Sequence, residues 1–280
     1  MGRGVAAALR YGRGMHEAQL LAPGEGETIR PGFEIKVGRP ELVLTEATYA
    51  PGDTGPDPHV HHDHVDSFFV VEGQLEWRVG PDLEPHTGAA GSFVSVPRDV
   101  LHTFRNTGPG PARFLNLHAP GLGFERYLRG DFPEFDQHYL PEGSGLPPDG
   151  VTLLGPGEGE RLELGESTAT IKLGVDEIGV FEAEIGGDFP HQPAHRHLQS
   201  MESFYLLEGE FGLILDDSES TLQPGGFAAV TPGTVHTSPP SAAPLRFLTL
   251  FTPGGMVGYL REAVRLGGPP DAAGHDIEFV

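Results

Sequence analysis

One stretch of the sequence decides how the chain is organised: His195-Arg196-His197-Leu198-Gln199-Ser200-Met201-Glu202-Ser203-Phe204-Tyr205-Leu206-Leu207-Glu208-Gly209. His195 and His197 are two residues apart, so their imidazoles share one face if the segment is a β-strand. Glu202 follows, and an apolar run then ends at Glu208-Gly209, as at a tight turn. Three potential metal ligands therefore point the same way from a short segment.

The same arrangement occurs earlier in the chain, in the stretch PHVHHDHVDSFFVVEG from Pro58 to Gly73. A further histidine follows a turn in each half, after GSFVSVPRDVL and after GGFAAVTPGTV. Each half thus offers four candidate metal ligands: His59, His61, Asp66 and His102 in the first, and His195, His197, Glu202 and His236 in the second. The shorter side chain of Asp66 leaves open whether it reaches an ion directly or through water. His62 and His64 either substitute for it or lie in a solvated turn.

The repetition extends over the whole chain and indicates a duplicated domain. The sequence LLAPGEGE at 20–27 matches LLGPGEGE at 153–160. Between the halves, the Pro/Gly-rich segment 141–150 has no periodicity and reads as a connector. We therefore expect domain one at 15–140 and domain two at 151–280. Residues 1–14 are expected to form a disordered extension, and either Met1 or Met15 can be the true start.

Short strands dominate both halves, because 41 glycines and 27 prolines interrupt the sequence throughout. Alternating or β-branched segments predict strands at 42–49, 68–71, 75–79, 93–96 and 113–118, and again at 179–185, 204–207, 212–215, 227–230 and 246–251. Only 124–129 and 256–266 are typical of helices, and each closes its domain. An all-β chain of this kind favours a barrel or jelly roll.

Composition limits the partners and the metal. The net charge of −22 argues against nucleic acid or an anionic membrane as a partner. Cysteine is absent, so neither disulfides nor thiolate sites are possible, and histidine and carboxylate ligands suit Fe, Mn, Ni, Cu or Zn without distinguishing them. The first residues lack the apolar core of a signal peptide, so a cytoplasmic location is expected.

The two motifs in each half resemble those of the cupin superfamily. The first is HxH followed by a carboxylate and then a glycine, and the second is a glycine, a PxG turn and a histidine. The resemblance covers both halves, so the chain looks like a bicupin, a tandem pair of jelly-roll β-barrels. It implies a divalent metal held by three histidines and one carboxylate. Asp99, Thr231 and Pro240 depart from the second motif.

Within the superfamily, the HxHH…FxVxEG sequence pattern and the PGEGE segment before it are most similar to those of quercetin-dioxygenase-like proteins. This resemblance implies a metal-dependent dioxygenase for a small enolisable or aromatic substrate, with Glu202 or Asp66 as the catalytic base. A cupin decarboxylase or isomerase of a small hydroxy acid, and a non-enzymatic binding protein, stay open as alternatives. Glu202 has the expected length, so the second barrel is the stronger candidate for chemistry. The chain can be a monomer or a homo-oligomer.

The last predicted strand of each half differs in character. Phe114, Asn116 and His118 should share one face, and their counterparts are Phe247, Thr249 and Phe251. If this face points inward, the first barrel has a more polar cavity than the second. The only lysines, Lys36 and Lys172, fall at equivalent places and are predicted to be solvated strand residues.

Overall fold

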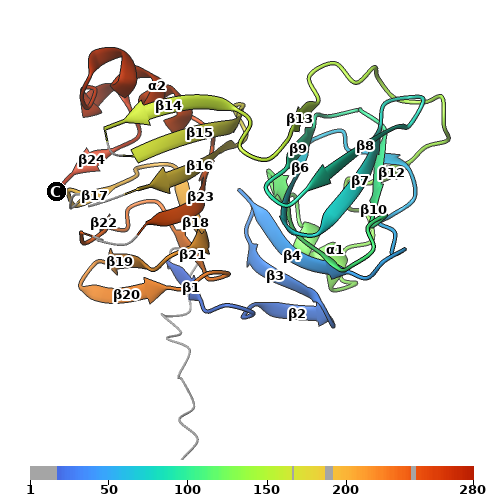
Figure 1. Cartoon of the computed structure of the whole chain (residues 1–280), viewed down its shortest axis with the longest axis horizontal. Helices are drawn as coiled ribbons and strands as arrows, with labels where there is room; N and C mark the ends of the chain where they lie inside the picture. Colours follow the sequence, from blue (N-terminus) through green and yellow to red (C-terminus); the bar gives the residue numbers. More distant parts are fainter. Residues whose placement is uncertain (1–17, 166, 187–191, 241–243) are drawn as a thin grey trace, which may run out of the picture.

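The computed structural model describes residues 18–165, 167–186, 192–240 and 244–280. They form two β-barrels that lie side by side, with β2, β3 and β4 of the first facing the second (Figure 1). The predicted extension at 1–14, with Met15, lies outside the described residues. None of the helices within the described ranges has the length and apolar character that a membrane crossing requires.

Barrel one consists of two antiparallel sheets that face each other. The larger sheet has the order β13 (Thr152–Leu154), β9 (Phe93–Val96), β6 (Val65–Glu72), β11 (Ala112–Ala119), β4 (Val43–Tyr49), β3 (Phe33–Gly38) and β2 (Glu27–Arg30). The smaller sheet has the order β12 (His138–Tyr139), β5 (His59–Val60), β10 (His102–Arg105), β7 (Gln74–Val79) and β8 (Glu84–Ala89).

Barrel two repeats this plan. Its larger sheet has the order β1 (Gln19–Leu21), β21 (Phe227–Val230), β18 (Met201–Glu208), β23 (Leu245–Thr252), β16 (Gly179–Ile185), β15 (Ser167–Gly174) and β14 (Glu160–Leu164). Its smaller sheet has the order β20 (Ser218–Leu222), β19 (Phe211–Leu215), β22 (His236–Thr237), β17 (His195–Arg196) and β24 (Glu278–Phe279).

The two halves exchange one strand each. β1 precedes barrel one in the sequence but pairs with β21 of barrel two, with Gln19 opposite Ala229. β13 follows the connector but pairs with β9 of barrel one, with Thr152 opposite Ser95. Figure 1 shows blue β1 beside the orange strands and yellow-green β13 beside the teal ones. A division of the chain at 141–150 therefore separates each of these strands from the sheet that it completes.

All the strands predicted from the alternating pattern are present, and the two tandem jelly-roll barrels confirm the expected fold class. Each barrel is followed by the predicted helix, α1 (Phe124–Leu128) or α2 (Met256–Leu266), and the 3₁₀ turn η1 (Ala272–Gly274) follows α2. α2 ends where Gly267 takes a left-handed conformation with φ of 68°, which glycine adopts without steric cost. The chain then returns to the smaller sheet as β12 or β24.

The barrels pack against each other through the outer faces of their larger sheets. In β11, Phe114 belongs to the core of barrel one, whereas Leu115 and Leu117 lie in a cluster shared with Tyr205 and Leu248 of barrel two. Strands buried on both faces carry apolar residues at most positions, which explains the largely apolar sequences of β11 and β23. This shared core joins the two cupins within one chain.

The prediction that both lysines are solvated is wrong. Lys36 is 1% exposed and Lys172 is 3% exposed. The Nζ of Lys36 lies 3.0 Å from Oε2 of Glu46, and that of Lys172 lies 3.1 Å from Oε2 of Glu182. A buried ammonium group is tolerated when a carboxylate and further hydrogen bonds compensate its lost hydration. The sequence did not reveal these ion pairs, because each partner glutamate is ten residues downstream, on the next strand.

The PGEGE segments complete these ion pairs. Lys36 Nζ donates to the backbone oxygen of Glu25 at 2.7 Å, and Lys172 Nζ donates to that of Glu158 at 2.8 Å. The glycine that follows each glutamate lies against the neighbouring strand. At Gly159, with φ of 138°, an added Cβ would lie 2.4 Å from the backbone oxygen of Ile171. The repeated glycines thus allow the chain to approach closely enough for its carbonyl to reach the lysine.

Candidate metal centres

The strand register brings the predicted ligands together. His59 on β5 lies directly opposite His102 on β10, and His195 on β17 lies opposite His236 on β22. Residues opposite each other in an antiparallel pair point to the same face, which here is the barrel interior. In each barrel the four predicted residues are buried, and one ligand atom from each lies within 4.8 Å of the others.

In barrel two the carboxylate lies at the centre of the group. Oε2 of Glu202 is 3.1 Å from Nε2 of His197 and 2.8 Å from Nε2 of His236. The ring centroids of His195 and His236 are 4.1 Å apart. Three imidazoles and one carboxylate therefore converge from three different strand segments.

In barrel one the shorter Asp66 also reaches the group. Its Oδ2 lies 3.2 Å from Nε2 of His102 and 3.7 Å from Nε2 of His61. The ring centroids of His59 and His102 are 4.3 Å apart. The missing methylene does not remove the carboxylate from the cluster, so the two barrels present the same set of donors.

The hydrogen bonds behind the rings orient each histidine for coordination. In both barrels the Nδ1 atoms of the six histidines face backbone carbonyl oxygens at 2.5 to 3.1 Å: those of Asp57, Asp136, Val100, Pro193, Asp276 and Thr234. A carbonyl only accepts, so each Nδ1 carries the hydrogen and each neutral ring turns an Nε2 lone pair inward. Nε2 of His61 has no hydrogen-bond partner although it is buried. These donors fit a divalent metal ion.

The electrostatics keep both carboxylates ionised but act differently on the histidines. Burial lowers the pKa of His197, but its hydrogen bond to Glu202 outweighs burial and raises the pKa, so a metal at this site would displace that proton. Burial raises the pKa of the Glu202 carboxyl, but hydrogen bonds from His197 and His236 outweigh it and hold the pKa far below its usual range. Burial likewise opposes ionisation of Asp66, and its histidine neighbours lower its pKa well below the ordinary value. Burial lowers the pKa of His59 to about 2. Anionic carboxylates and neutral imidazoles are the forms that bind a metal.

Two aspartates that the sequence analysis missed hold the loop after each HxH pair. The backbone oxygen of Asp136 accepts from His61, and its carboxylate accepts from the backbone N–H groups of His62 and Asp63. Asp276 does the same in barrel two, where it accepts from His197 Nδ1 and from three consecutive backbone N–H groups. The sequence signal was present, because each half ends with an aspartate three residues before an aromatic residue.

The sequence left open whether His62 and His64 replace Asp66 as ligands or lie in a solvated turn, and the structure gives a different answer for each. His62 is exposed and lies 2.5 Å from Oδ1 of Asp99, as expected for a solvated turn. His64 is 0% exposed and lies inside the barrel, with its Nε2 2.8 Å from Nδ1 of His118. Nδ2 of Asn116 donates to Oδ1 of Asp66 at 2.5 Å. The prediction that His118 and Asn116 face inward is confirmed.

A cavity opens beside each group, and the two cavities differ as predicted. The cavity of barrel one, about 310 Å³, is lined by aromatic side chains such as Phe104 and Phe124 and, in addition, by polar ones that include Arg30, Asn116, His118 and Gln137. The cavity of barrel two, about 320 Å³, is lined mainly by apolar ones: Phe181, Phe251, Met256, Leu260, Ile277 and Phe279. Asp66 and Glu202 border their respective cavities. The barrels therefore offer similar donors to ligands of different polarity.

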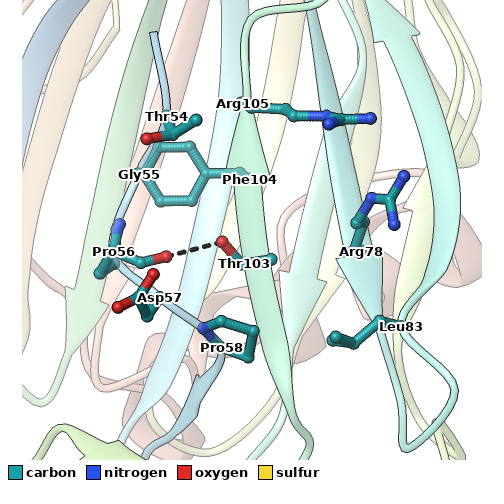
Figure 2. Close-up of a pocket in the computed structure, with 10 residues that line it drawn as sticks. All are labelled: Thr54, Gly55, Pro56, Asp57, Pro58, Arg78, Leu83, Thr103, Phe104 and Arg105. Atoms are coloured by element: carbon teal, nitrogen blue, oxygen red, sulfur yellow. Dashed lines mark hydrogen bonds between the residues drawn. The ribbon is translucent and has the colours of Figure 1, made fainter. Parts of the chain in front are cut away.

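A further pocket of about 290 Å³ in barrel one is lined by the loop 54–58, by β10 and by Arg78 (Figure 2). Thr103 Oγ1 donates to the backbone oxygen of Pro56 at 2.6 Å and holds this loop against β10. Gly55 packs on the ring of Phe104, where an added Cβ would lie 2.8 Å from ring carbons. Thr54, Gly55 and Pro56 of this loop line both this pocket and the metal-facing cavity.

The fold and the paired donor sets define a tandem cupin with two candidate metal centres. The Cupin domain family matches residues 45–118 and 179–251, which together hold every predicted ligand. The chain belongs to this family.

Similar proteins include two dioxygenases and an 11S globulin. The chain is 32% identical to quercetin 2,3-dioxygenase of Bacillus subtilis (strain 168) over 262 residues, covering 78% of this chain and 77% of that protein. Salicylate 1,2-dioxygenase from Pseudaminobacter salicylatoxidans has a similar structure, with 12% identity, a TM-score of 0.58 and coverage of 78% and 73%. The 11S globulin from Wrightia tinctoria gives 12% identity, a TM-score of 0.58 and coverage of 85% and 83%. The structural likenesses extend to the fold alone.

Proposed function

We propose that this protein is a metal-dependent dioxygenase of the quercetinase type that cleaves a small, enolisable aromatic substrate in barrel two. The observation that carries the proposal is the position of the donor group: three histidines and Glu202 converge at the edge of an apolar cavity. The similarity to quercetin 2,3-dioxygenase over most of both chains supports it.

The bound metal would be held by His195, His197, Glu202 and His236, and when bound it supplies a Lewis acid for a substrate oxygen and a site for dioxygen. The donor set suits Fe, Mn, Ni, Cu or Zn and does not distinguish them. His59, His61, Asp66 and His102 are proposed as the ligands of a second ion in barrel one.

The protein's own residues supply binding and proton acceptance. Phe181, Phe251 and Phe279 line the cavity of barrel two, so a planar aromatic ligand fits there with its polar edge toward the carboxylate. Glu202 is ionised and borders the cavity, so it is placed to accept the proton of a substrate hydroxyl. The surrounding apolar side chains exclude water and strengthen this interaction.

Oxygen consumption tests the proposal. Protein loaded separately with iron and with manganese is incubated with flavonols and other enolisable aromatics, and oxygen uptake is recorded with an electrode. Uptake that requires both metal and substrate, and that is lost in Glu202→Gln, supports the proposal. Absence of uptake across the panel, with metal bound, contradicts it.

The arginine in the cavity lining of barrel one favours a second candidate, the decarboxylation or isomerisation of a small hydroxy acid. Arg30 lines this cavity, so a carboxylate-bearing ligand finds a cation there. This reaction would proceed without oxygen. Turnover of hydroxy acids under anaerobic conditions, sensitive to Asp66→Asn and not to Glu202→Gln, would distinguish it from the dioxygenase. A ligand that stabilises the protein without turnover would instead indicate a binding protein.

A further inference from the structure

Barrel one contains a third histidine group next to its first donor set. One ring nitrogen from each of His61, His64 and His118 lies within 4.8 Å of the others, and all three side chains are buried. The ring centroids of His61 and His64 are 4.0 Å apart, and those of His64 and His118 are 4.9 Å apart. The group shares His61 with the first set, while His64 and His118 belong to it alone.

Asp136 orients two of these rings. Nδ1 of His61 lies 2.5 Å from the backbone oxygen of Asp136, and Nδ1 of His64 lies 2.9 Å from its Oδ2. Carbonyl and carboxylate oxygens only accept hydrogen bonds, so both Nδ1 atoms carry the hydrogen. In the neutral rings, the Nε2 atoms of His61 and His64 therefore have the free lone pairs.

Asn116 orients the third ring from the opposite side. Its Nδ2 donates to Oδ1 of Asp66 at 2.5 Å and to the backbone oxygen of Ser67 at 3.2 Å, so its Oδ1 is the atom that faces His118. Nε2 of His118 lies 3.0 Å from this oxygen and must donate to it. The free lone pair of neutral His118 is then on Nδ1.

The lone pairs of this group consequently meet inside the protein. Nε2 of His64 and Nδ1 of His118 are 2.8 Å apart, a distance at which two unprotonated nitrogens repel unless a cation lies beside them. Nε2 of His61 is buried and has no hydrogen-bond partner. Imidazoles that turn one nitrogen toward a common point and donate the other N–H to an oxygen are typical of metal sites.

We propose that barrel one has a second metal position, formed by His61 Nε2, His64 Nε2 and His118 Nδ1, for a borderline divalent cation such as Zn²⁺, Co²⁺, Ni²⁺ or Cu²⁺. Three neutral nitrogen donors suit these ions. An ion at this position prevents full occupation of the site formed by His59, His61, Asp66 and His102, because Nε2 of His61 coordinates one ion at a time. Barrel one thus binds its ion at either of two adjacent positions.

Barrel two provides the internal control. Ser200 occupies the place of His64, and Phe251 lies opposite Glu202 as His118 lies opposite Asp66. Asp276 still accepts the hydrogen bonds that Asp136 accepts from the ligand histidine and the loop. The loop geometry therefore does not require the extra histidines, and their presence in barrel one needs another reason.

The test removes both four-residue sets while keeping His61. The variant His59→Ala/His102→Ala/His195→Ala/His236→Ala is titrated with Co²⁺, and bound metal is measured by elemental analysis and by the visible absorption of the ion. We expect about one equivalent per chain to remain. Adding His64→Ser and His118→Phe, the residues that barrel two carries, should remove it. Two results would overturn the proposal. In the first, the four-alanine variant folds but binds no metal, since a proton between His64 and His118 then explains their contact. In the second, metal stays bound after His64→Ser and His118→Phe have been added.

A second measurement covers the case in which the variant does not fold. Crystals of the wild-type protein loaded with Co²⁺ should give an anomalous-scattering peak among His61, His64 and His118. A peak in barrel one only among His59, His61, Asp66 and His102 overturns the proposal. Neither experiment depends on oxygen uptake, so the outcome is separate from that of the proposed dioxygenase activity.

Discussion

The two barrels share a backbone plan and a donor set but differ in what surrounds the donors. Aromatic side chains line both cavities, but the carboxylate of barrel two borders a mainly apolar one, whereas Asp66 of barrel one contacts Asn116 and His118, and His118 in turn contacts His64. Duplication followed by divergence inside the barrels explains why the donors are alike and their surroundings differ. The strands that position the donors also build the shared core. The chemistry therefore follows from the lining and not from the fold.

Removal of the ligand histidines gives the largest expected contrast. His195→Ala/His197→Ala should release one equivalent of metal and lower oxygen uptake at least about a hundredfold, because the ion's contribution is worth several kcal/mol. His59→Ala/His61→Ala should release the other equivalent, since it removes both positions of barrel one, but leave most of the uptake. Metal analysis and oxygen-electrode rates check both variants. Equal loss of uptake in the two would end the assignment of the reaction to barrel two.

Replacement of a buried lysine should reduce stability strongly. Lys172→Met leaves Glu182 without its close partner, and the expected loss is about 3–5 kcal/mol in the free energy of unfolding. Lys36→Met should cost less, because Glu46 keeps Arg113 Nη1 at 3.0 Å, whereas Arg246 Nε is 3.7 Å from Glu182. Urea denaturation measures both. A larger loss for Lys36→Met would show that the arginines do not compensate.

The aspartates behind the HxH loops should affect metal affinity more moderately. Asp276→Asn weakens the acceptors that hold the loop of barrel two and should lower its metal affinity about 10–100-fold. Asp136→Asn should act more strongly on barrel one, because this carboxylate also accepts from His64. Competition with a chromophoric chelator gives the two affinities. An unchanged affinity in both variants would limit the aspartates to a role in folding.

The smallest contrast concerns two equivalent surface ion pairs. Arg129 binds Glu27 through two contacts of 2.6 Å, and Arg261 binds Glu160 through contacts of 2.6 to 3.1 Å. Exposed pairs contribute little, so Arg129→Ala and Arg261→Ala should each reduce stability by at most about 1 kcal/mol. Thermal unfolding at low and high salt checks this. A larger loss of stability that salt does not change would mean that the aliphatic parts of the two arginine side chains stabilise the protein by packing against the terminal segments.

The donor residues could be found from the sequence because their spacing carries the geometry. HxH has the period of a strand, and the later histidine follows a turn that returns the chain to the opposite position. The inward face of Phe114, Asn116 and His118 was also predictable from alternation. The inward position of the His64 ring was not predictable, because a residue in a loop has no periodicity, and the ring is held by Asp136, seventy-two residues away, and by His118.

The sequence by itself determined the duplicated cupin fold and the two sets of four donors, since both depend on local period and on repetition. Only the tertiary structure decided three other properties. Long-range pairing exchanged β1 and β13 between the barrels. Packing of the two larger sheets buried Lys36 and Lys172 beside glutamates. Contacts between distant loops and strands brought His61, His64 and His118 together. Each depends on residues far apart in the chain, which no local pattern records.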